Sequence, residues 1–306
     1  MTALRGHPGP SAALLDGAAR LPQLGVISAC GEEAADFLHR QLTQDIAGMA
    51  LGQSGLAALC NAKGRVLADL TVIHHAGGEF FLVVAADLLP VALKLLVMYR
   101  LRAHVELDDA SADWSVWGAI GAATQVACMA TGHALTVPLA PADGAARALC
   151  LRRPGALVAG APQLSVDEWE FAQVRSGVAA LSAPVSGAFT PQMLNYESAG
   201  LIHFGKGCYP GQEVIARTQF RGAVKRRAYV GHVAGTARAG DNVFLSADNG
   251  EPCGLIAQAA PAPGGGTAVI ASVKTAAVDG NAGIAIGSAQ GPVLRDLFIP
   301  YALQKI

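Results

Sequence analysis

The residues best suited to chemistry lie in the stretch HFGKGCYPGQEVIARTQFRG, residues 203–222. If its first half is extended, alternate side chains share a face, so Lys206 and Cys208 project the same way. An ammonium group near a thiol favours the thiolate. Pro210 and Gly211 then predict a turn, followed by a helix whose positive N-terminal end also favours a thiolate at Cys208. The spacing therefore predicts a reactive cysteine.

The helix expected after this turn carries the sequence QEVIARTQF. Its expected inward positions are Val214, Ile215 and Phe220. Glu213 and Arg217 are four residues apart and are expected to form an ion pair on the helix surface. The pattern is that of a helix with one buried face.

A nucleotide-binding loop is the competing interpretation, because GLIHFGK, residues 200–206, satisfies G-x-x-x-x-G-K. Ser or Thr normally follows that lysine to bind magnesium, whereas Gly207 follows here. The interior Leu-Ile-His-Phe is also bulky where small residues let backbone amides surround phosphate. We therefore set ATP binding aside. A role for His203 as a base or ligand stays open beside a structural one.

The other five cysteines are dispersed, without a C-x-x-C pair: Cys30, Cys60, Cys128, Cys150 and Cys253. That spacing argues against a zinc ribbon or a thioredoxin motif. The neighbours of Cys60, Cys128 and Cys150 are mostly apolar, and we expect these thiols to be buried and inert. Cys208 is the cysteine with features of a functional thiol.

The elements that must position these residues predict a mixed α and β body. LGVISA from Leu24 predicts a strand, and a helix follows from about Glu32. Residues 54–84 hold apolar runs separated by Asn-Ala-Lys-Gly and Ala-Gly-Gly, which predict three strands joined by two turns. The helix LLPVALKLLVMYRLRA and the strand HVELDD come next. Because no βαβ unit repeats, we predict an α+β fold rather than a doubly wound sheet.

The rest of the chain differs in composition and in the length of its apolar runs. Residues before about Pro22 are rich in Gly, Ala and Pro and are expected to be loosely ordered, and residues 113–164 carry only short apolar runs. VDEWEFAQVRSGV predicts a helix ending near Gly177. After Arg227, short strands punctuated by Gly, Pro and Asn predict a small β-barrel or sandwich. We place the domain boundary near residue 226.

Composition excludes several classes of protein. The 306 residues suffice for two or three domains, and they contain no uninterrupted run of the ~20 apolar residues that a membrane span needs. The N-terminus lacks the pattern of a secretory signal, so a cytoplasmic location is expected. A net charge of −1 gives no global argument for nucleic-acid binding. We therefore expect neither a nucleic-acid nor a membrane partner.

The cysteine stretch also carries a family resemblance. KGCYPGQEVIART, residues 206–218, closely resembles the K-G-C-Y-x-G-Q-E signature of the YgfZ family. These are folate-binding proteins related to the T-protein, the aminomethyltransferase of the glycine cleavage system, and they are implicated in the maturation of iron–sulfur enzymes. Further matches are FLHRQLTQDI from Phe37, LCNAKGRVLADL from Leu59 and FTPQMLNYESAGL from Phe189. The resemblance covers roughly residues 25–300.

The resemblance implies a T-protein-like architecture. Its parts are a folate-binding α+β body with a ferredoxin-like portion over residues 1–225, a C-terminal β-barrel over residues 226–306, and a central cavity for tetrahydrofolate or another reduced folate. The family's cysteine falls on Cys208. The T-protein's Asp-Asp pair reads Ala68-Asp69 here, which leaves Asp69 as the candidate catalytic carboxylate. The positions that the resemblance implies for folate binding are Asp69, Pro191, Gln192, Asn195, Glu197, Lys206, Tyr209, Gln212, Glu213 and Arg217.

One further departure from T-proteins concerns the helix before Gly177. T-proteins carry Glu-Ala-Gly where this chain reads Arg175-Ser176-Gly177, so a carboxylate that could hold a cationic amine or a pterin N–H edge is replaced by a cation. When a buried donor of the ligand loses its acceptor on the protein, the free energy of binding weakens by about 1–3 kcal/mol. Aminomethyl transfer in the T-protein manner is therefore disfavoured.

Three functions are compatible with these residues. In the first, the protein is a tetrahydrofolate-binding accessory factor for assembly or repair of iron–sulfur clusters, with folate, iron–sulfur assembly proteins and client enzymes as partners. Cys208 then acts as a thiolate. Because one cysteine cannot hold a cluster alone, we expect no resident metal and at most transient ligation. In the second, the protein is a folate-dependent one-carbon transferase with Asp69 as a proton shuttle. In the third, it is a partner-binding scaffold with a vestigial folate cavity.

Overall fold

The structure is a computed structural model, in which residues 11–13, 15–121, 135–155, 161–246, 250–280 and 283–304 are described. The strands are β1 (Gly17–Arg20), β2 (Leu24–Cys30), β3 (Ser54–Cys60), β4 (Val66–His74), β5 (Phe80–Ala85), β6 (Glu106–Asp109), β7 (Ser115–Ile120), β8 (Leu135–Ala142), β9 (Ala145–Arg152), β10 (Arg226–Val233), β11 (Asn242–Leu245), β12 (Gly254–Pro261), β13 (Thr267–Lys274), β14 (Ile284–Ile286) and β15 (Val293–Phe298). The α-helices are α1 (Ala34–Gln41), α2 (Leu89–Arg100), α4 (Val166–Arg175), α5 (Gln212–Arg221) and α6 (Thr275–Asp279), and the short 3-10 helices are η1 (Ala183–Val185) and η2 (Pro191–Leu194).

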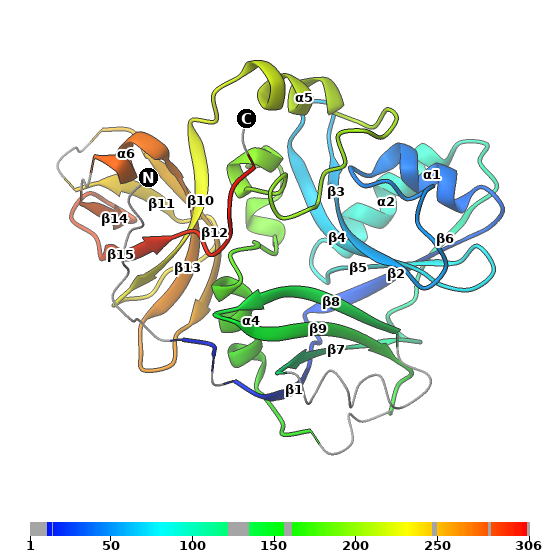
Figure 1. The fold of residues 1–306 in the computed structure, drawn as a ribbon, viewed down its shortest axis with the longest axis horizontal. Helices are drawn as coiled ribbons and strands as arrows, with labels where there is room; N and C mark the ends of the chain where they lie inside the picture. Colours follow the sequence, from blue (N-terminus) through cyan, green and yellow to red (C-terminus); the bar gives the residue numbers. More distant parts are fainter. Residues whose placement is uncertain are drawn as a thin grey trace.

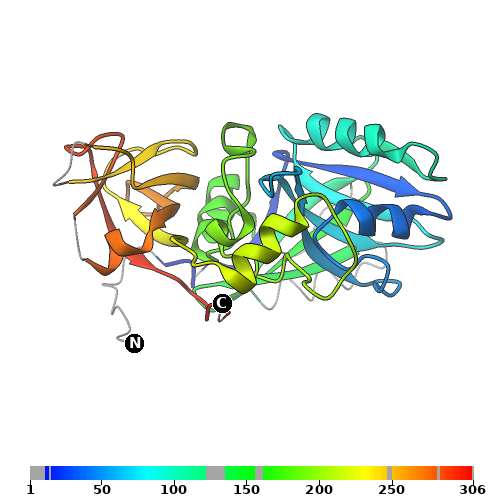
Figure 2. The same ribbon diagram turned by 90° about the horizontal axis from the view of Figure 1, so that it is seen from above.

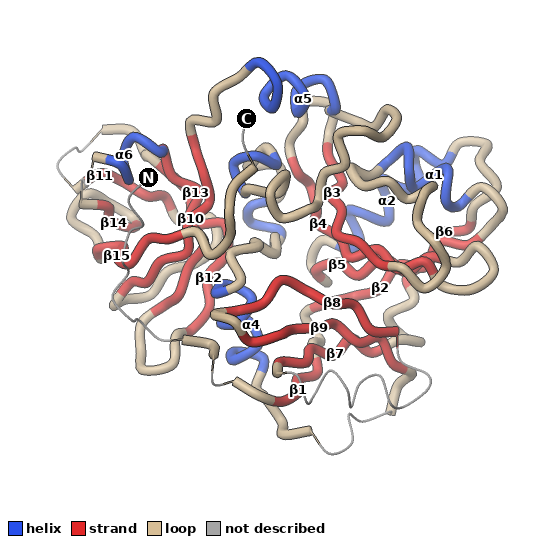
Figure 3. The backbone as a smooth tube through the Cα atoms, in the orientation of Figure 1, coloured by secondary structure: helices blue, strands red, loops and turns tan. Residues whose placement is uncertain are grey.

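Two sheets and a closed barrel organise these elements (Figures 1 and 3). One sheet has the strand order β3-β4-β5-β2-β6, and the other has the order β1-β7-β9-β8. The barrel has the order β10-β13-β12-β11-β14-β15. The predicted α+β body with a C-terminal β-barrel is therefore confirmed.

The five-stranded sheet follows the sequence signals closely. The turns at Asn-Ala-Lys-Gly and Ala-Gly-Gly separate β3, β4 and β5, as expected. Helix α2 buries Leu89, Ala92 and Leu96 and packs against β2 and β6. Apolar residues at this helical spacing form one stripe, which the sheet covers. The predicted strands and helices of this region are confirmed.

The four-stranded sheet contains a strand that was not expected. Residues before Pro22 were predicted to be loose, yet β1 pairs antiparallel with β7, from Gly17 opposite Ile120 to Arg20 opposite Trp117. Small side chains give β1 little strand propensity of its own, but Ala18 and Ala19 are buried once β7 supplies the hydrogen bonds. Residues 1–10 and 14 lie outside the described part.

Helix α4 connects the sheets to the barrel. It begins with a capping box, in which the Ser165 side chain accepts from the backbone of Glu168 and the Glu168 carboxylate accepts from Ser165. The helix packs against β1 and β8 and, on its other side, against β12 and β13 of the barrel. Figure 2 shows the barrel at one end of the molecule, the five-stranded sheet at the other and green helical segments between them.

The barrel includes the five strands predicted after Arg227, and it adds β15 and α6. Strand β10 begins at Arg226. The division of the chain into two domains at residue 225 stays a prediction. Of the helices in the described ranges, none has both the length and the apolar character to span a membrane.

Candidate functional site

The motif cysteine lies in an irregular loop rather than in a strand. Residues 201–211 contain turns at 204–206 and 210–211 and lead directly into α5. Cys208 is exposed, whereas Lys206 is buried with only 8% of its surface accessible. The stretch is not extended, so the premise from which a shared face for these two side chains was predicted does not hold.

Lys206 binds the end of α1. Its ammonium group donates to the backbone carbonyl of Leu42 at 2.6 Å and to that of His39, where the helix dipole is negative. It also lies 4.9 Å from the ring centre of Tyr209. Burial lowers the pKa of Lys206 to about 8, against the opposing effect of Asp45 and Cys208. The lysine thus anchors the cysteine loop to the helix that contains FLHRQ.

The glycine of the Pro-Gly turn fits against the β3–β4 turn. Gly211 has φ +82°, and a Cβ atom there would lie 2.5 Å from the carbonyl oxygen of Asn61 and 2.7 Å from Cα of Gly64. A Cβ on Gly64 would in turn approach Val214 to 3.1 Å. The start of α5 and the Asn-Ala-Lys-Gly turn are therefore in direct contact, and only glycine fits at Gly211 without displacing the backbone.

Helix α5 differs from expectation at its C-terminal end. Ile215 is buried and Val214 half-buried as predicted, but Phe220 is 69% exposed and meets only the edge of Phe204, 5.6 Å away between ring centres, among the ring contacts described. The prediction that Phe220 points inward is wrong, because the last turn of α5 extends beyond the body toward β10 (Figure 1). Glu213 and Arg217 are both described and exposed, and no ion pair within 4.0 Å joins them.

The Pro191–Glu197 loop forms a buried polar network. Glu197 is fully buried and pairs with Arg227 of β10. The Arg227 guanidinium also lies 3.4 Å from Asn195 Oδ1, and the Asn195 amide donates to the carbonyl of Ala228 at 2.8 Å. These bonds tie η2 to the first barrel strand.

Gln192 and Pro191 complete this network from the other side. The Gln192 amide donates to the carbonyl of Ile215 at 2.9 Å, which links η2 to α5. Both residues are buried. Neither they nor Asn195 and Glu197 line the central cavity. Their predicted part in folate binding stays a prediction, and their observed contacts are between elements of the protein.

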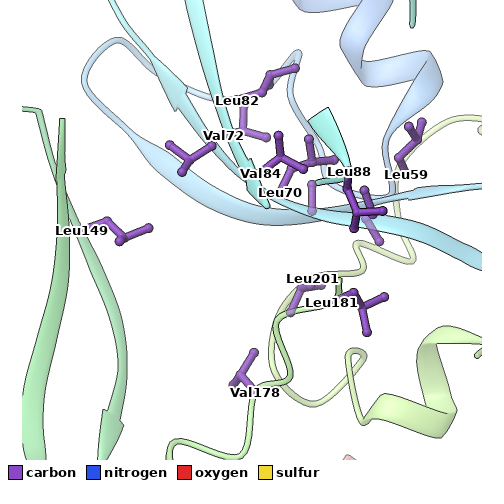
Figure 4. Close-up of a cluster of buried hydrophobic side chains, with 14 of the residues drawn as sticks. Leu59, Leu70, Val72, Leu82, Val84, Leu88, Leu149, Val178, Leu181 and Leu201 are labelled. Carbon is purple, nitrogen blue, oxygen red and sulfur yellow. The ribbon is translucent and has the colours of Figure 1, made fainter. Parts of the chain in front are cut away.

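The central cavity lies between the five-stranded sheet, the β8–β9 hairpin and α4. Figure 4 shows part of its apolar wall, including Leu70, Val84, Leu149, Leu181 and Leu201. The enclosed part has a volume of about 80 Å³ and adjoins a more open pocket of about 500 Å³. Small-molecule sites typically need roughly 300–1,000 Å³. The two together reach that range, and the enclosed part alone does not. The residues that line both are Leu24, Ala85, Glu170, Ala180 and Leu181.

Asp69 is the sequence-predicted site residue that lines this cavity. Its Oδ1 accepts a hydrogen bond from the backbone N–H of Leu181 at 2.8 Å. Burial nevertheless raises the pKa of Asp69 from 3.8 to about 6, a value suited to proton transfer near neutral pH. Ala68, where T-proteins have their other aspartate, is 1% exposed and projects to the opposite face of β4.

The cation of Arg175 does not line the cavity. Its guanidinium pairs with both carboxylate oxygens of Asp143 at 2.7 Å and lies 4.7 Å from the ring centre of Phe298. Glu170, Gln173 and Ser176 line the cavity instead. Residues three apart share a helix face, so α4 turns these side chains inward and Arg175 outward. The expectation that Arg175 deprives the ligand site of its carboxylate is corrected, because Glu170 supplies one.

Four further cavity residues were missed by the sequence analysis: Arg147, Trp169, Glu170 and Gln173. The only available signal was weak. Arg147 lies within the strand AARALCLR, whose other charged residue is Arg152 at its end, and Glu170 and Gln173 are polar residues on one face of a helix. Like Asp69 they line the cavity, and Arg147, Glu170 and Gln173 give it the few polar groups that ligand sites have.

The remaining predicted positions lie away from the cavity. Tyr209 is buried next to Lys206, Gln212 is half-buried, and Glu213 and Arg217 are exposed on α5. None of them lines the cavity. His203 is exposed, and its backbone N–H donates to Thr43.

The other described cysteines are less accessible than Cys208. Cys60, Cys150 and Cys253 are buried and Cys30 is half-buried. Burial raises the pKa of Cys60 to about 12, and burial together with Glu79 raises that of Cys30 to about 11. Cys128 lies outside the described residues. Within the described ranges, no three or more His, Cys, Asp or Glu side chains are grouped so that they could hold a metal ion.

Comparison with known proteins supports this arrangement. The family model described as the GCVT N-terminal domain matches residues 17–131. The crystal structure of the glycine cleavage system aminomethyltransferase T from Bartonella henselae has the same fold, with a TM-score of 0.71 at 15% identity over 96% of this chain and 88% of that one.

Two sequence relatives are closer. An uncharacterized protein of Haemophilus influenzae is 32% identical over 213 residues, which cover 69% of this chain and 71% of the relative. The tRNA-modifying protein YgfZ of Klebsiella pneumoniae is 30% identical over 250 residues, or 74% of this chain and 75% of that protein. With this degree of identity over most of both chains, and with a T-protein fold around the K-G-C-Y loop, the chain belongs to the YgfZ family.

Proposed function

We propose that the protein is a tetrahydrofolate-binding accessory factor that supports assembly or repair of iron–sulfur clusters in client enzymes. The proposal assigns two tasks to two places. The central cavity with Asp69 binds the reduced folate, and Cys208 engages a cluster, a partner thiol or an oxidised species. We propose that this takes place in the cytoplasm.

The observation that carries the proposal is the exposure of Cys208. Among the described cysteines it alone is exposed, and it is held in place by a loop whose lysine and glycine are used for anchoring. Buried Lys206 on one side and the close contact of Gly211 with the β3–β4 turn on the other fix the backbone while the thiol stays accessible. Such a thiol can reach a partner protein or a cluster held by one, which a buried thiol cannot.

The cavity supports the folate part of the proposal. A mostly apolar wall suits a flat heterocycle, and Asp69, Glu170, Gln173 and Arg147 offer donors and acceptors to it. When bound, a reduced folate would supply one-carbon or redox chemistry at its ring nitrogens. The protein's own contribution is to bind the ring and to hold or accept a proton at Asp69.

The name of a YgfZ relative suggests which enzymes the protein could serve. The Klebsiella protein is called a tRNA-modifying protein. We carry this to the present chain as a proposal that its clients include tRNA-modifying enzymes with iron–sulfur clusters. Direct contact with tRNA is the weaker alternative, because a net charge of −1 gives the chain no overall attraction for phosphates.

A second candidate function is a folate-dependent one-carbon transferase. The raised pKa of Asp69, about 6, favours it, because a carboxyl group that titrates near neutral pH can both donate and accept a proton. Its test is turnover: formation of 5,10-methylenetetrahydrofolate from an amine donor that is lost in Asp69→Asn. No turnover with any amine donor would remove this candidate.

The folate part is tested by calorimetry of the purified full chain with tetrahydrofolate. We expect saturable binding that weakens about tenfold or more in Asp69→Asn, since a charged acceptor in a buried site is worth about 1.5–3 kcal/mol. Glu213→Gln is the control, because Glu213 lies on the exposed surface of α5 and does not line the cavity. This variant is expected to bind tetrahydrofolate as tightly as wild type does. No binding of any reduced folate would favour a scaffold with a vestigial cavity.

A further inference from the structure

Arg147 is a buried cation whose guanidinium donors are only partly satisfied by hydrogen bonds within the protein. It lies on β9, it is 1% exposed, and it lines the central cavity. Its guanidinium donates to Gln173 Oε1 at 2.5 Å and to the carbonyl of Ala140 at 3.3 Å, and its Nε has no hydrogen-bond partner. No carboxylate lies within 4.0 Å of it among the described residues.

This arrangement is costly for the fold alone. An Arg side chain has five N–H donors, and a buried charge without a counter-ion is strongly destabilising unless a partner satisfies it. Burial lowers the pKa of Arg147 to about 9, although Glu170 acts in the opposite direction. A ligand acceptor in the cavity would supply the missing partner.

The guanidinium is held in a fixed orientation by Trp169. It lies 4.5 Å from the centre of the Trp169 ring. The same ring lies against Gly118 of β7, where a Cβ atom would come within 2.3 Å of Trp169 Cε3. The absence of a side chain at Gly118 therefore makes room for the ring that contacts the Arg147 guanidinium.

Glu170 provides the complementary acceptor. Its two oxygens accept from the amides of Gln23 at 2.7 Å and of Gln258 at 3.0 Å, which orients the carboxylate. Each oxygen keeps a second lone pair for a ligand donor. Glu170 lies on the wall shared by the enclosed cavity and the open pocket, on the helix that also carries Trp169.

We infer that Arg147 and Glu170 recognise a lactam, a carbonyl next to an N–H, on a flat heterocyclic ligand. Arg147 donates to the carbonyl oxygen and Glu170 accepts from the N–H. Arg147 and Glu170 line the same cavity and form no ion pair with each other. The donor of one and the acceptor of the other are therefore both available to the adjacent carbonyl and N–H of a lactam. The inference rests on the proposed folate function, in which the lactam is the 4-oxo and N3–H edge of the pterin. It adds that this edge, rather than the N5 and N10 side that carries one-carbon units, determines which pteridines bind.

The test compares tetrahydrofolate with its 4-amino-4-deoxy analogue. The analogue reverses the pattern, because an amino group replaces the carbonyl and N3 loses its hydrogen. By anaerobic calorimetry, wild type is expected to bind the 4-oxo compound at least about tenfold more tightly, as expected for an unpaired buried donor. In Arg147→Met this preference is expected to fall below about threefold. Arg152→Met, also buried on β9 but outside the cavity lining, is expected to keep it.

The outcomes separate this inference from the proposed function. Equal or tighter binding of the 4-amino compound by wild type would overturn the lactam assignment while leaving folate binding intact. If a folded Arg147→Met protein kept the full preference for the 4-oxo compound, Arg147 would have no part in recognising the lactam. Absence of binding of both compounds would overturn the proposed function as well. Because the wild-type comparison uses two ligands and no variant, it decides the question even if Arg147→Met does not fold.

Discussion

The ammonium group of Lys206 lies 2.6 Å from the carbonyl oxygen of Leu42, at the C-terminal end of α1. Two stretches with separate motifs are thereby joined across the body. The motif lysine, which the sequence suggested as a neighbour that activates the thiol, holds the loop that presents Cys208.

Replacing this lysine should loosen the loop. In Lys206→Met the carbonyls of His39 and Leu42 lose their donor while they stay largely buried, so we expect a loss of about 1–3 kcal/mol in the free energy of unfolding. Urea denaturation measures it. Lys63→Met, on an exposed turn residue, is the matched control and should change stability by less than about 0.5 kcal/mol. Equal stability of both variants would contradict the anchoring role.

Cys208 should be the first cysteine to react. At pH 7.5 we expect iodoacetamide to label it ahead of half-buried Cys30, whose pKa is raised to about 11. Peptide mapping by mass spectrometry identifies the labelled site, including any reaction at Cys128. Cys208→Ser should lose the fast-labelled peptide and Cys30→Ser should keep it. Faster labelling at any other cysteine would be incompatible with the account.

Asp69 should make the protein less stable as the pH rises. Its pKa is about 6 in the folded state and 3.8 as the ordinary value, so between these values the folded state holds more protons than the unfolded state. By linkage, stability then falls as pH rises from about 4 to 6. Asp69→Asn keeps an acceptor for Leu181 and removes the charge.

At about 1.4 kcal/mol per pKa unit, we expect Asp69→Asn to be more stable than wild type by up to about 3 kcal/mol at pH 7.5. The difference should nearly vanish below about pH 3, where Asp69 is protonated in both states. Chemical denaturation at the two pH values measures both quantities. If Asp69→Asn were less stable than wild type at pH 7.5, the ionised carboxylate of Asp69 would be stabilised by its surroundings in the folded protein, and the expectation would be contradicted.

The Glu197–Arg227 pair should behave as a structural unit. Removing one partner leaves a buried unpaired charge, so Arg227→Met is expected to cost about 3–5 kcal/mol. The double variant Arg227→Met, Glu197→Met should recover most of this loss, because no charge remains buried. A double-mutant cycle by urea denaturation gives the coupling energy. A double variant as unstable as the single one would mean that Glu197 serves another partner.

The sequence predicted elements whose signals are local. The strands β3 to β5 are bounded by turns that contain glycine. Helix α2 is a mostly apolar run with Lys94 and Arg100 as its charged residues, and α4 has apolar residues at helical spacing, so each was recognisable from its own residues. Strand β1 was not, because its pairing with β7 depends on residues about a hundred positions away. Its alanines and glycine have no strand preference until that partner is in place.

The same distinction applies to the site. Asp69 was predicted for the cavity and lines it. The side chains that were placed wrongly, Lys206 and Phe220, depended on a loop path and on how far α5 extends beyond the body, which spacing does not determine. Arg147 could not be identified in advance, because an arginine in a strand usually projects into solvent. In the structure only 1% of its surface is exposed, and its guanidinium lies against the ring of Trp169.

The central claim is that the exposed thiol of Cys208 serves iron–sulfur enzymes, and one measurement tests it directly. The activity of a [4Fe–4S]-dependent enzyme is assayed in cells that lack the gene, grown under oxidative stress and complemented with wild type, Cys208→Ala or Cys30→Ala at matched protein levels. The account predicts that wild type and Cys30→Ala restore the activity and that Cys208→Ala does not. Full restoration by Cys208→Ala would contradict it.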